Sequence, residues 1–296
     1  QGRAGGVHPM IIMREEESCM NRFKEQAMKI VFMVAACASV LAVFLICLFL
    51  FANGIPAIAK IGPLKFLLGT VWKPSNDKFG IFPMIIASIY VTGGAILVGV
   101  PIALFTSVFM ARYCPKKIYR PLKSGIELMA GVPSIVYGLF GMLFFVTACH
   151  MSYSLMAGIL TVAIMVLPTG LRTTEEALLA VPDSFREGSF GLGAGKLRTV
   201  FRIVLPSAIP GILSGVILST GRIAGETAAL IYTAGTMATL PKNLLSSGRT
   251  LAVHMYVLSQ EGLHTDQAFA TAVILLVMVL LINILSSVIA KKMQRD

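Results

Sequence analysis

Arg222 and Glu226 are two ionisable residues placed four positions apart inside an otherwise apolar run, STGRIAGETAALIY. A charge at such a depth costs several kcal/mol unless it is paired or faces a cavity. If the run is one helix, the spacing puts both side chains on the same face. The pair could then lock two helices together. Alternatively, it could line a path for an oxyanion, because the planar guanidinium matches oxyanion geometry. Thr220 and Thr227 could offer hydroxyl groups nearby.

A second polar cluster, EEALLAVPDSFREGSFGLGAGKLRTVFRIVLP at residues 175–206, interrupts the apolar sequence. Its GLGAGK segment is not a phosphate-binding loop of the form G-x-x-x-x-G-K-[ST]. Phe190 stands where the first glycine is required, and Leu197 follows the lysine. The dinucleotide pattern G-x-G-x-x-G fails as well, because Lys196 occupies the position of its third glycine. No nucleotide site is therefore visible in the sequence.

The same cluster predicts a short helix. Pro182 ends the preceding helix, and Ser184 and Glu187 have the spacing of a capping box, with Asp183 as the alternative cap. Three glycines, at positions 191, 193 and 195, stop the helix. We expect Phe185 and Leu192 to be exposed on it. Such a segment is either a solvated loop helix or one that fits a groove of another protein.

The composition defines the surroundings of both clusters. The chain has 56% hydrophobic and 13% charged residues and a mean hydropathy of +0.82, whereas soluble domains carry about 25% charged residues. Several apolar runs reach roughly 20 residues, enough to span a bilayer. The five cysteines are scattered and the four histidines isolated, so neither a disulfide framework nor a metal site is indicated. We expect an all-α polytopic membrane protein without a cofactor.

Six transmembrane helices are predicted, at residues 29–53, 81–111, 122–148, 152–173, 205–233 and 267–290. The second and third contain Pro101 and Pro133, breaks that membrane helices tolerate when neighbouring groups satisfy the freed carbonyls. The glycines of GVPSIVYGLFG favour close helix packing.

The lysine and arginine bias predicts the orientation. With residue 1 inside, the inner segments hold seventeen of these residues and the outer segments six. Residues 1–28 and 291–296 are then cytoplasmic, and residues 54–80 form an external loop. This bias also accounts for the net charge of +11 without nucleic acid as a partner. Residues 1–9 are typical of a vector-derived extension, with a natural start expected at Met10, Met13 or Met20.

The interrupting cluster resembles the EAA loop of ABC importer permeases, E-A-A-x3-G-x9-I-x-L-P. Glu187, Gly188 and Ser189 stand at the E-A-A positions, and Gly193 follows after three residues. Nine more residues lead to the Ile-x-Leu-Pro sequence at 203–206. The departure is Gly-Ser for Ala-Ala, which keeps the side chains small. The resemblance implies a type I importer permease fold with six spans. It also implies a coupling helix, at 183–195 between the fourth and fifth spans, that docks a separate ATPase.

Further segments resemble the permease subunits of the Pst phosphate importer over residues 80–290, and residues 81–290 are the predicted permease core. These are AGVPSIVYGLFG, LRTTEEALLAVPDSFREGSFGLGA, VLPSAIPGILSGVILSTGRIAGETAALIYTAG and GRTLAVHMY. TEEALLAVP and GETAALIYTAG are similar to PstA, whereas FLLGTVWKPSNDKFGIFPMI at 66–85 is similar to PstC. The resemblance implies a permease subunit in a prokaryotic inner membrane that transports phosphate but does not itself hydrolyse ATP. Its partners would be membrane lipid, a second permease, two copies of a PstB-like ATPase and a PstS-like extracytoplasmic phosphate-binding protein.

The resemblance also implies roles for the two polar clusters. Arg222 would receive the anion, and Glu226 would hold the arginine so that it does not trap phosphate. The coupling residues would be Phe185, Arg186, Glu187, Gly188, Ser189, Leu192 and Gly193. Two alternatives remain: a permease for another oxyanion or nutrient, and a secondary transporter or channel that acts alone.

Overall fold

The computed structural model describes residues 9–293, and the chain divides into two units at Ala52 and Asn53. In the described part, five helices are long and apolar enough to cross a membrane, at 25–61, 82–112, 155–179, 196–224 and 265–288. A bent pair, Lys116–Ala130 and Ser134–Ala148, makes a sixth if it counts as one span. The predicted all-α polytopic class is confirmed.

The first unit consists of the described part of α1 (Pro9–Ile61) that precedes residue 53. Large apolar side chains such as Phe32, Val40 and Phe44 are exposed along it. A helix that is apolar all round is typical of a membrane span. The first predicted span, 29–53, lies inside α1, which continues beyond it at both ends.

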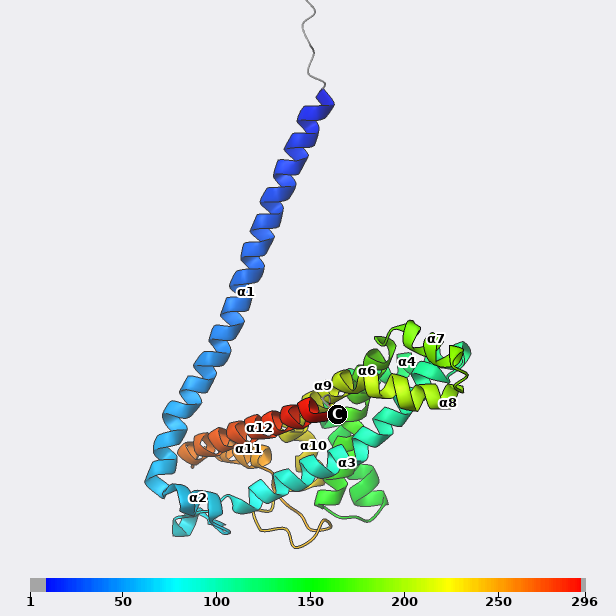
Figure 1. Cartoon of the computed structure of the whole chain (residues 1–296). Coiled ribbons are helices and arrows are strands. Elements are labelled where there is room, and N and C mark those ends of the chain that lie inside the picture. Colours follow the sequence, from blue (N-terminus) through cyan, green and yellow to red (C-terminus); the bar gives the residue numbers. More distant parts are fainter. Residues whose placement is uncertain (1–8, 294–296) are drawn as a thin grey trace, which may run out of the picture. The chain divides into compact units, whose positions relative to one another are not determined.

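The second unit starts in the last turns of α1 and contains the remaining elements (Figure 1). They are α2 (Pro63–Leu68), β1 (Trp72–Lys73), η1 (Pro74–Asn76), β2 (Lys78–Phe79), α3 (Phe82–Arg112), α4 (Lys116–Ala130), α5 (Ser134–Gly141), η2 (Met142–Ala148), α6 (Leu155–Leu179), α7 (Asp183–Gly191), α8 (Lys196–Thr199), η3 (Val200–Val204), α9 (Leu205–Ala224), α10 (Ala228–Thr233), α11 (Leu251–Glu261) and α12 (Thr265–Met293). The two short strands pair as an antiparallel hairpin.

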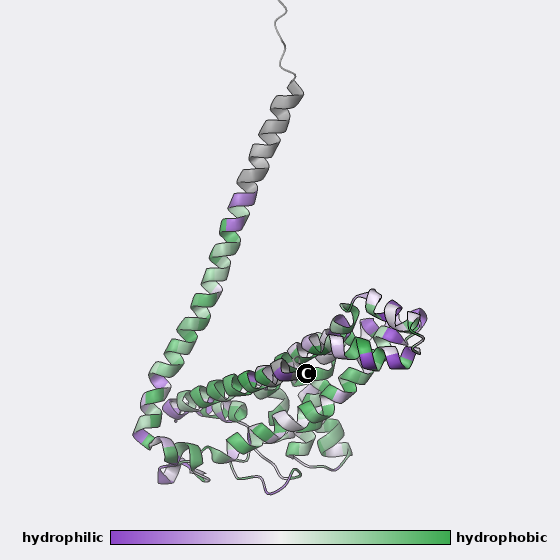
Figure 2. Ribbon diagram, viewed as in Figure 1, coloured by the Kyte–Doolittle hydropathy of each residue, from purple (hydrophilic) through white to green (hydrophobic). Residues whose placement is uncertain are grey.

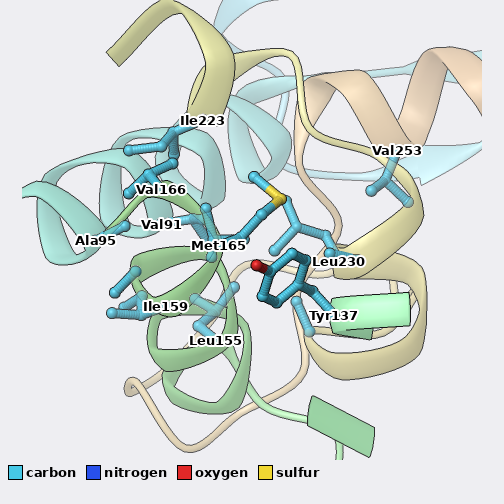
Figure 3. Packing of buried hydrophobic residues seen from close by; sticks show 14 of the residues in the cluster. Val91, Ala95, Tyr137, Leu155, Ile159, Met165, Val166, Ile223, Leu230 and Val253 are labelled. Carbon is cyan, nitrogen blue, oxygen red and sulfur yellow. The ribbon is translucent and has the colours of Figure 1, made fainter. Parts of the chain in front are cut away.

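The core of this unit is the packing of α3, α6 and α9, with α5 and α10 against α6. Tyr137 of α5 lies among Met165 of α6 and Leu230 of α10, next to Ile159 and Val91 (Figure 3). α3 runs from α2 at one end to α4, α7 and α8 at the other (Figure 1). Hydrophilic residues gather on α4, α7 and α8 (Figure 2), so the polar ends of several spans meet there.

Two predicted spans are wrong in detail. The third, 122–148, is not continuous: α4 ends at Ala130 and α5 begins after Pro133, with a bend of 98°. Proline lacks the N–H of an intrahelical hydrogen bond and disfavours helical geometry in the residue before it. Pro101 remains inside α3, as expected. The fifth span, 205–233, begins earlier, at Lys196, and is interrupted after Ala224.

The segment 234–266, between the fifth and sixth predicted spans, contains an additional helix, α11. The Thr250 hydroxyl accepts a hydrogen bond from Val253 N, and Gly262 ends the helix. The side chain of Ser88 in α3 accepts a hydrogen bond from Leu251 N at 2.9 Å. α11 is therefore fixed to α3 and is part of the folded unit.

His254 of α11 lies at the contact between this helix and the β1–β2 hairpin. The Trp72 ring stands perpendicular to the imidazole, with 4.2 Å between centroids, and Arg249 Nη1 is 3.2 Å from Nδ1. His254 is fully buried, and within the described chain Nε2 has no hydrogen-bond partner. Burial and, to a smaller extent, the Arg249 charge lower the pKa of His254 from 6.5 to about 3.

We therefore expect this contact to be acid-sensitive. Because the folded pKa lies below the unfolded value, stability is full above pH 6.5 and falls as the pH drops from 6.5 toward 3. At pH 5 the loss is about 2 kcal/mol. Trp72 is the only tryptophan of the chain, so its fluorescence should report the opening of the hairpin. His254→Gln should flatten the response over this range, and His150→Asn is the matched control. An unchanged transition in His254→Gln would remove His254 as its cause.

Candidate functional site

The segment between α6 and α9 forms a helical hairpin at the polar end of the second unit (Figure 1). α6 ends at Leu179, and Pro182, with φ −55°, directly precedes α7. Gly193 then takes φ +80°, and Ala194 N donates a 3.1 Å hydrogen bond to Ser189 O. A left-handed residue at this position is the usual end of a helix and favours glycine. The predicted segment 183–195 thus comprises α7 and its terminating turn.

One contact holds the hairpin together, a second joins it to the end of α3, and a third joins α3 to α6. Ser189 Oγ lies 2.9 Å from Thr199 Oγ1, and both side chains are buried. Lys196 Nζ lies 4.6 Å from the centre of the Tyr113 ring. Arg112 Nη2, at the end of α3, donates a 2.5 Å hydrogen bond to Leu178 O, at the end of α6. Side-chain contacts thus join α7 to α8, α8 to the residue after α3, and α3 to α6.

The hairpin exposes four large apolar side chains among its charged residues. Leu192 is 91% exposed, and Phe185, Phe190 and Leu197 are also exposed. Large apolar side chains gathered at a polar end of a protein mark an interaction surface. Phe185 and Leu192 were expected to be exposed, and they are. The sequence interpretation missed Phe190 and Leu197, although both are large apolar residues within the same polar segment.

Some of the remaining predicted coupling residues are exposed, and others are buried. Glu187 and Gly188 are exposed, whereas Ser189 is buried. The predicted capping box is wrong, because Pro182 is the N-cap and no side chain caps α7. Asp183 is instead the first helical residue. It accepts a 2.7 Å hydrogen bond from Arg186, an exposed pair of small energetic value.

Arg222 is exposed on α9, two residues before the helix ends. Its Nη1 donates a 3.3 Å hydrogen bond to Thr169 Oγ1 of α6. Sequence reasoning missed Thr169, since nothing in the spacing links α6 to α9. A guanidinium exposed here has to face water or a partner protein, because lipid would not solvate it.

Glu226 does not share a helix face with Arg222, and this prediction is wrong. α9 stops at Ala224, with Gly225 as its C-cap, so the i, i+4 relation is lost. Glu226 is 9% exposed, and its Oε1 accepts a 3.0 Å hydrogen bond from Ala229 N in the first turn of α10. Neither of the two ion pairs in the described residues joins Arg222 to Glu226.

The two threonines also lie apart from one another. Thr220 is buried and donates to Val216 O at 2.8 Å within α9. Thr227 lies at the break and donates to Gly225 O at 3.3 Å. Of the four residues expected to line a path, the structure leaves Arg222 exposed and Thr227 half-buried, and it buries Glu226 and Thr220.

The break at 225–227 lies beside the bend between α4 and α5, since α10 packs on α5. Tyr137 connects both sides of that bend, because its hydroxyl donates a 2.8 Å hydrogen bond to Met129 O. Irregular backbone at membrane depth is tolerated where it is covered by protein or lines a water-filled cavity. Arg222 thus lies two residues before the break in the α9–α10 segment.

Comparison with known proteins shows a consistent family. The model for "binding-protein-dependent transport system inner membrane component" matches residues 99–296. The chain is 32% identical to the probable ABC transporter permease protein YqgI of Bacillus subtilis, over 88% of this chain and 95% of the relative. It is 34% identical to a PstA homolog from Mycoplasma pneumoniae, over 82% of this chain and 37% of the relative, and 28% identical to PstC of Mesorhizobium japonicum, over 79% and 80%.

Solved structures show the same fold. A bacterial alginate ABC transporter chain aligns with a TM-score of 0.65 at 14% identity, over 90% of this chain and 96% of its own. A chain of the MetNI methionine ABC transporter aligns with a TM-score of 0.57 at 20% identity, over 72% and 94%. At these levels of identity, the similarity shows the type I importer permease fold and gives no information about the transported substrate.

Proposed function

The chain belongs to the family of binding-protein-dependent transport system inner membrane components and is an ABC importer permease subunit, and from that premise we propose that its cargo is inorganic phosphate. Relatives named as phosphate permeases, PstA and PstC, support this substrate. The observation that carries it is Arg222, an exposed cation that contacts Thr169 and lies two residues before the break after α9.

The division of labour follows from the family. The subunit is a multi-pass inner-membrane permease and not itself a catalytic enzyme, and its family works with an ATPase, a substrate-binding protein and a second permease. We propose that these are two copies of a PstB-like ATPase, a PstS-like protein and a PstA-like or PstC-like subunit. ATP-driven movement of the ATPase would reach α3 and α9 through the hairpin of α7 and α8.

The test is reconstitution of the complex with its co-purified subunits and binding protein in liposomes. We expect phosphate to stimulate ATP hydrolysis and uptake, and sulfate or methionine to have little effect. Stimulation by another oxyanion or by a nutrient such as methionine would replace phosphate as the cargo. Uptake by the chain alone, without ATPase, would instead favour a secondary transporter or channel.

The proposed orientation places α7 in the cytoplasm and the 234–250 segment outside, following the lysine and arginine bias. In a variant without its five native cysteines, Ser184→Cys should resist a membrane-impermeant thiol reagent in intact cells. Thr239→Cys should react. Both positions are exposed in the folded chain, so a difference in labelling reports the side of the membrane on which each position lies. The reverse labelling pattern would contradict this orientation.

A further inference from the structure

A basic pocket lies between the end of α1, α2 and the β1–β2 hairpin, far along the chain from Arg222. Its volume is about 530 Å³, and its charged lining residues are Lys60, Lys65, Lys78 and Asp77. Three ammonium groups thus surround one opening with a single carboxylate. This excess of positive charge lies on the predicted external side, where lysines and arginines are otherwise few.

The floor of the pocket is a fixed backbone crossing. A Cβ atom at Gly69 would lie 2.7 Å from Gly80 Cα, and one at Gly80 would collide with the Gly69 backbone. Only glycine at both positions permits this approach. Gly80 N donates to Val71 O and Phe82 N donates to Gly69 O, both at 3.1 Å. The pocket is therefore a preformed feature of the hairpin and α2, and both glycines line it.

The rim of the pocket combines this charge with an exposed apolar edge. Leu64 and Leu68, one turn apart on α2, are 72% and 62% exposed, whereas Phe66 on the opposite side is fully buried. Lys60 lies in the last turn of α1, where its apolar span ends. Lysines at the end of a span lie at the level of the lipid headgroups. Leu64 directly precedes the lining residue Lys65, and Leu68 directly precedes the lining residue Gly69, so both leucines adjoin the pocket lining along the chain.

We propose that this pocket binds a phosphate group, supplied by the headgroup of an anionic phospholipid. The lysines receive the phosphate, and Leu64 and Leu68 contact the acyl chains. Basic pockets between transmembrane helices bind anionic lipid headgroups on the cytoplasmic side of membranes, and the same chemistry applies to this pocket in the segment 54–80, which is predicted to be external. Inorganic phosphate offers the same chemistry without the chains, but the apolar rim and the position at the end of a span favour the lipid. The proposal does not depend on the transported cargo.

The test uses the purified full-length chain in detergent and the fluorescence of Trp72, whose hairpin borders the pocket. Short-chain phosphatidylglycerol, short-chain phosphatidylcholine and inorganic phosphate are titrated separately. We expect saturable binding of phosphatidylglycerol, with phosphatidylcholine much weaker. We expect a triple variant to bind phosphatidylglycerol about tenfold more weakly or worse, because each lysine near an anionic headgroup contributes to binding. This variant combines Lys60→Gln, Lys65→Gln and Lys78→Gln.

Lys73→Gln is the matched control, because Lys73 is exposed on the same hairpin but does not line the pocket. Native mass spectrometry of retained phosphatidylglycerol gives a second readout that does not depend on the environment of Trp72. If inorganic phosphate saturates the wild type and this binding is lost in the triple variant, the pocket is still a site for a phosphate group. The free ion is then the source of that group. Equal binding by the triple variant and the wild type, in both readouts, would overturn the proposal.

Discussion

Leu192→Asp is expected to abolish ATP-driven uptake while the subunit still inserts and assembles with the second permease. Leu192 is 91% exposed at the end of α7 and makes no contribution to the core. The substitution should therefore change the stability of the subunit little. If the side chain enters a groove of the ATPase, however, an unpaired carboxylate is buried there, at a cost of several kcal/mol. That cost corresponds to a loss of ATPase affinity of about a hundredfold or more.

The measurement is co-purification of the ATPase together with phosphate uptake in proteoliposomes. Leu263→Asp is the control, because Leu263 is 80% exposed beside α11, at the other end of the second unit. Both variants add the same charge to an exposed leucine, so only a docked surface distinguishes them. Normal uptake and normal ATPase retention in Leu192→Asp would show that the hairpin is not the docking surface.

Ser189 has a different role from Leu192, and this difference separates anchoring from docking. Its hydroxyl is buried against Thr199 inside the hairpin. A substitution there would loosen the connection between α7 and α8 and leave the outer surface unchanged. The small residue at this position of the EAA pattern is therefore explained by packing, and the exposed apolar residues are better candidates for contact with the ATPase.

Local signals in the sequence are sufficient to predict the helix α7. Pro182 and Gly193 act through their own backbone geometry, so the limits of α7 follow from residues in the segment itself. The capping box failed for a local reason as well. Ser184 and Glu187 have the right spacing, but with Pro182 as the N-cap the helix starts two residues too early for Ser184 to be its cap.

The site around Arg222 could not be predicted in the same way. Periodicity assumes a continuous helix, and Gly225 looks like one of many packing glycines in a membrane segment. Only the folded chain shows that the helix stops there and that Glu226 caps α10. Likewise, Thr169 reaches Arg222 through tertiary packing of α6 and α9, and no short spacing encodes that contact.

Arg222→Gln is expected to reduce phosphate uptake by ten- to a hundredfold while complex yield stays normal. The guanidinium is exposed and its one hydrogen bond, to Thr169, is long, so its loss should cost the fold little. Hydrogen bonds between a charged group and an anion contribute about 1.5–3 kcal/mol, which sets the expected range. Arg222→Lys keeps the charge but loses the planar fork. We therefore expect slower uptake than in the wild type and faster uptake than in Arg222→Gln.

Glu226 provides the variants that distinguish a path residue from a helix lock. Glu226→Gln retains an oxygen that can accept from Ala229 N, so uptake should remain near normal, whereas Glu226→Ala removes the cap and should cost about 1 kcal/mol of stability. Because the two side chains do not pair, Arg222→Gln combined with Glu226→Gln should transport no better than Arg222→Gln alone. Binding-protein-dependent phosphate uptake and complex yield are measured for all five variants. Recovery of uptake in the double variant would restore the paired interpretation, and wild-type uptake in Arg222→Gln would remove Arg222 from the anion path.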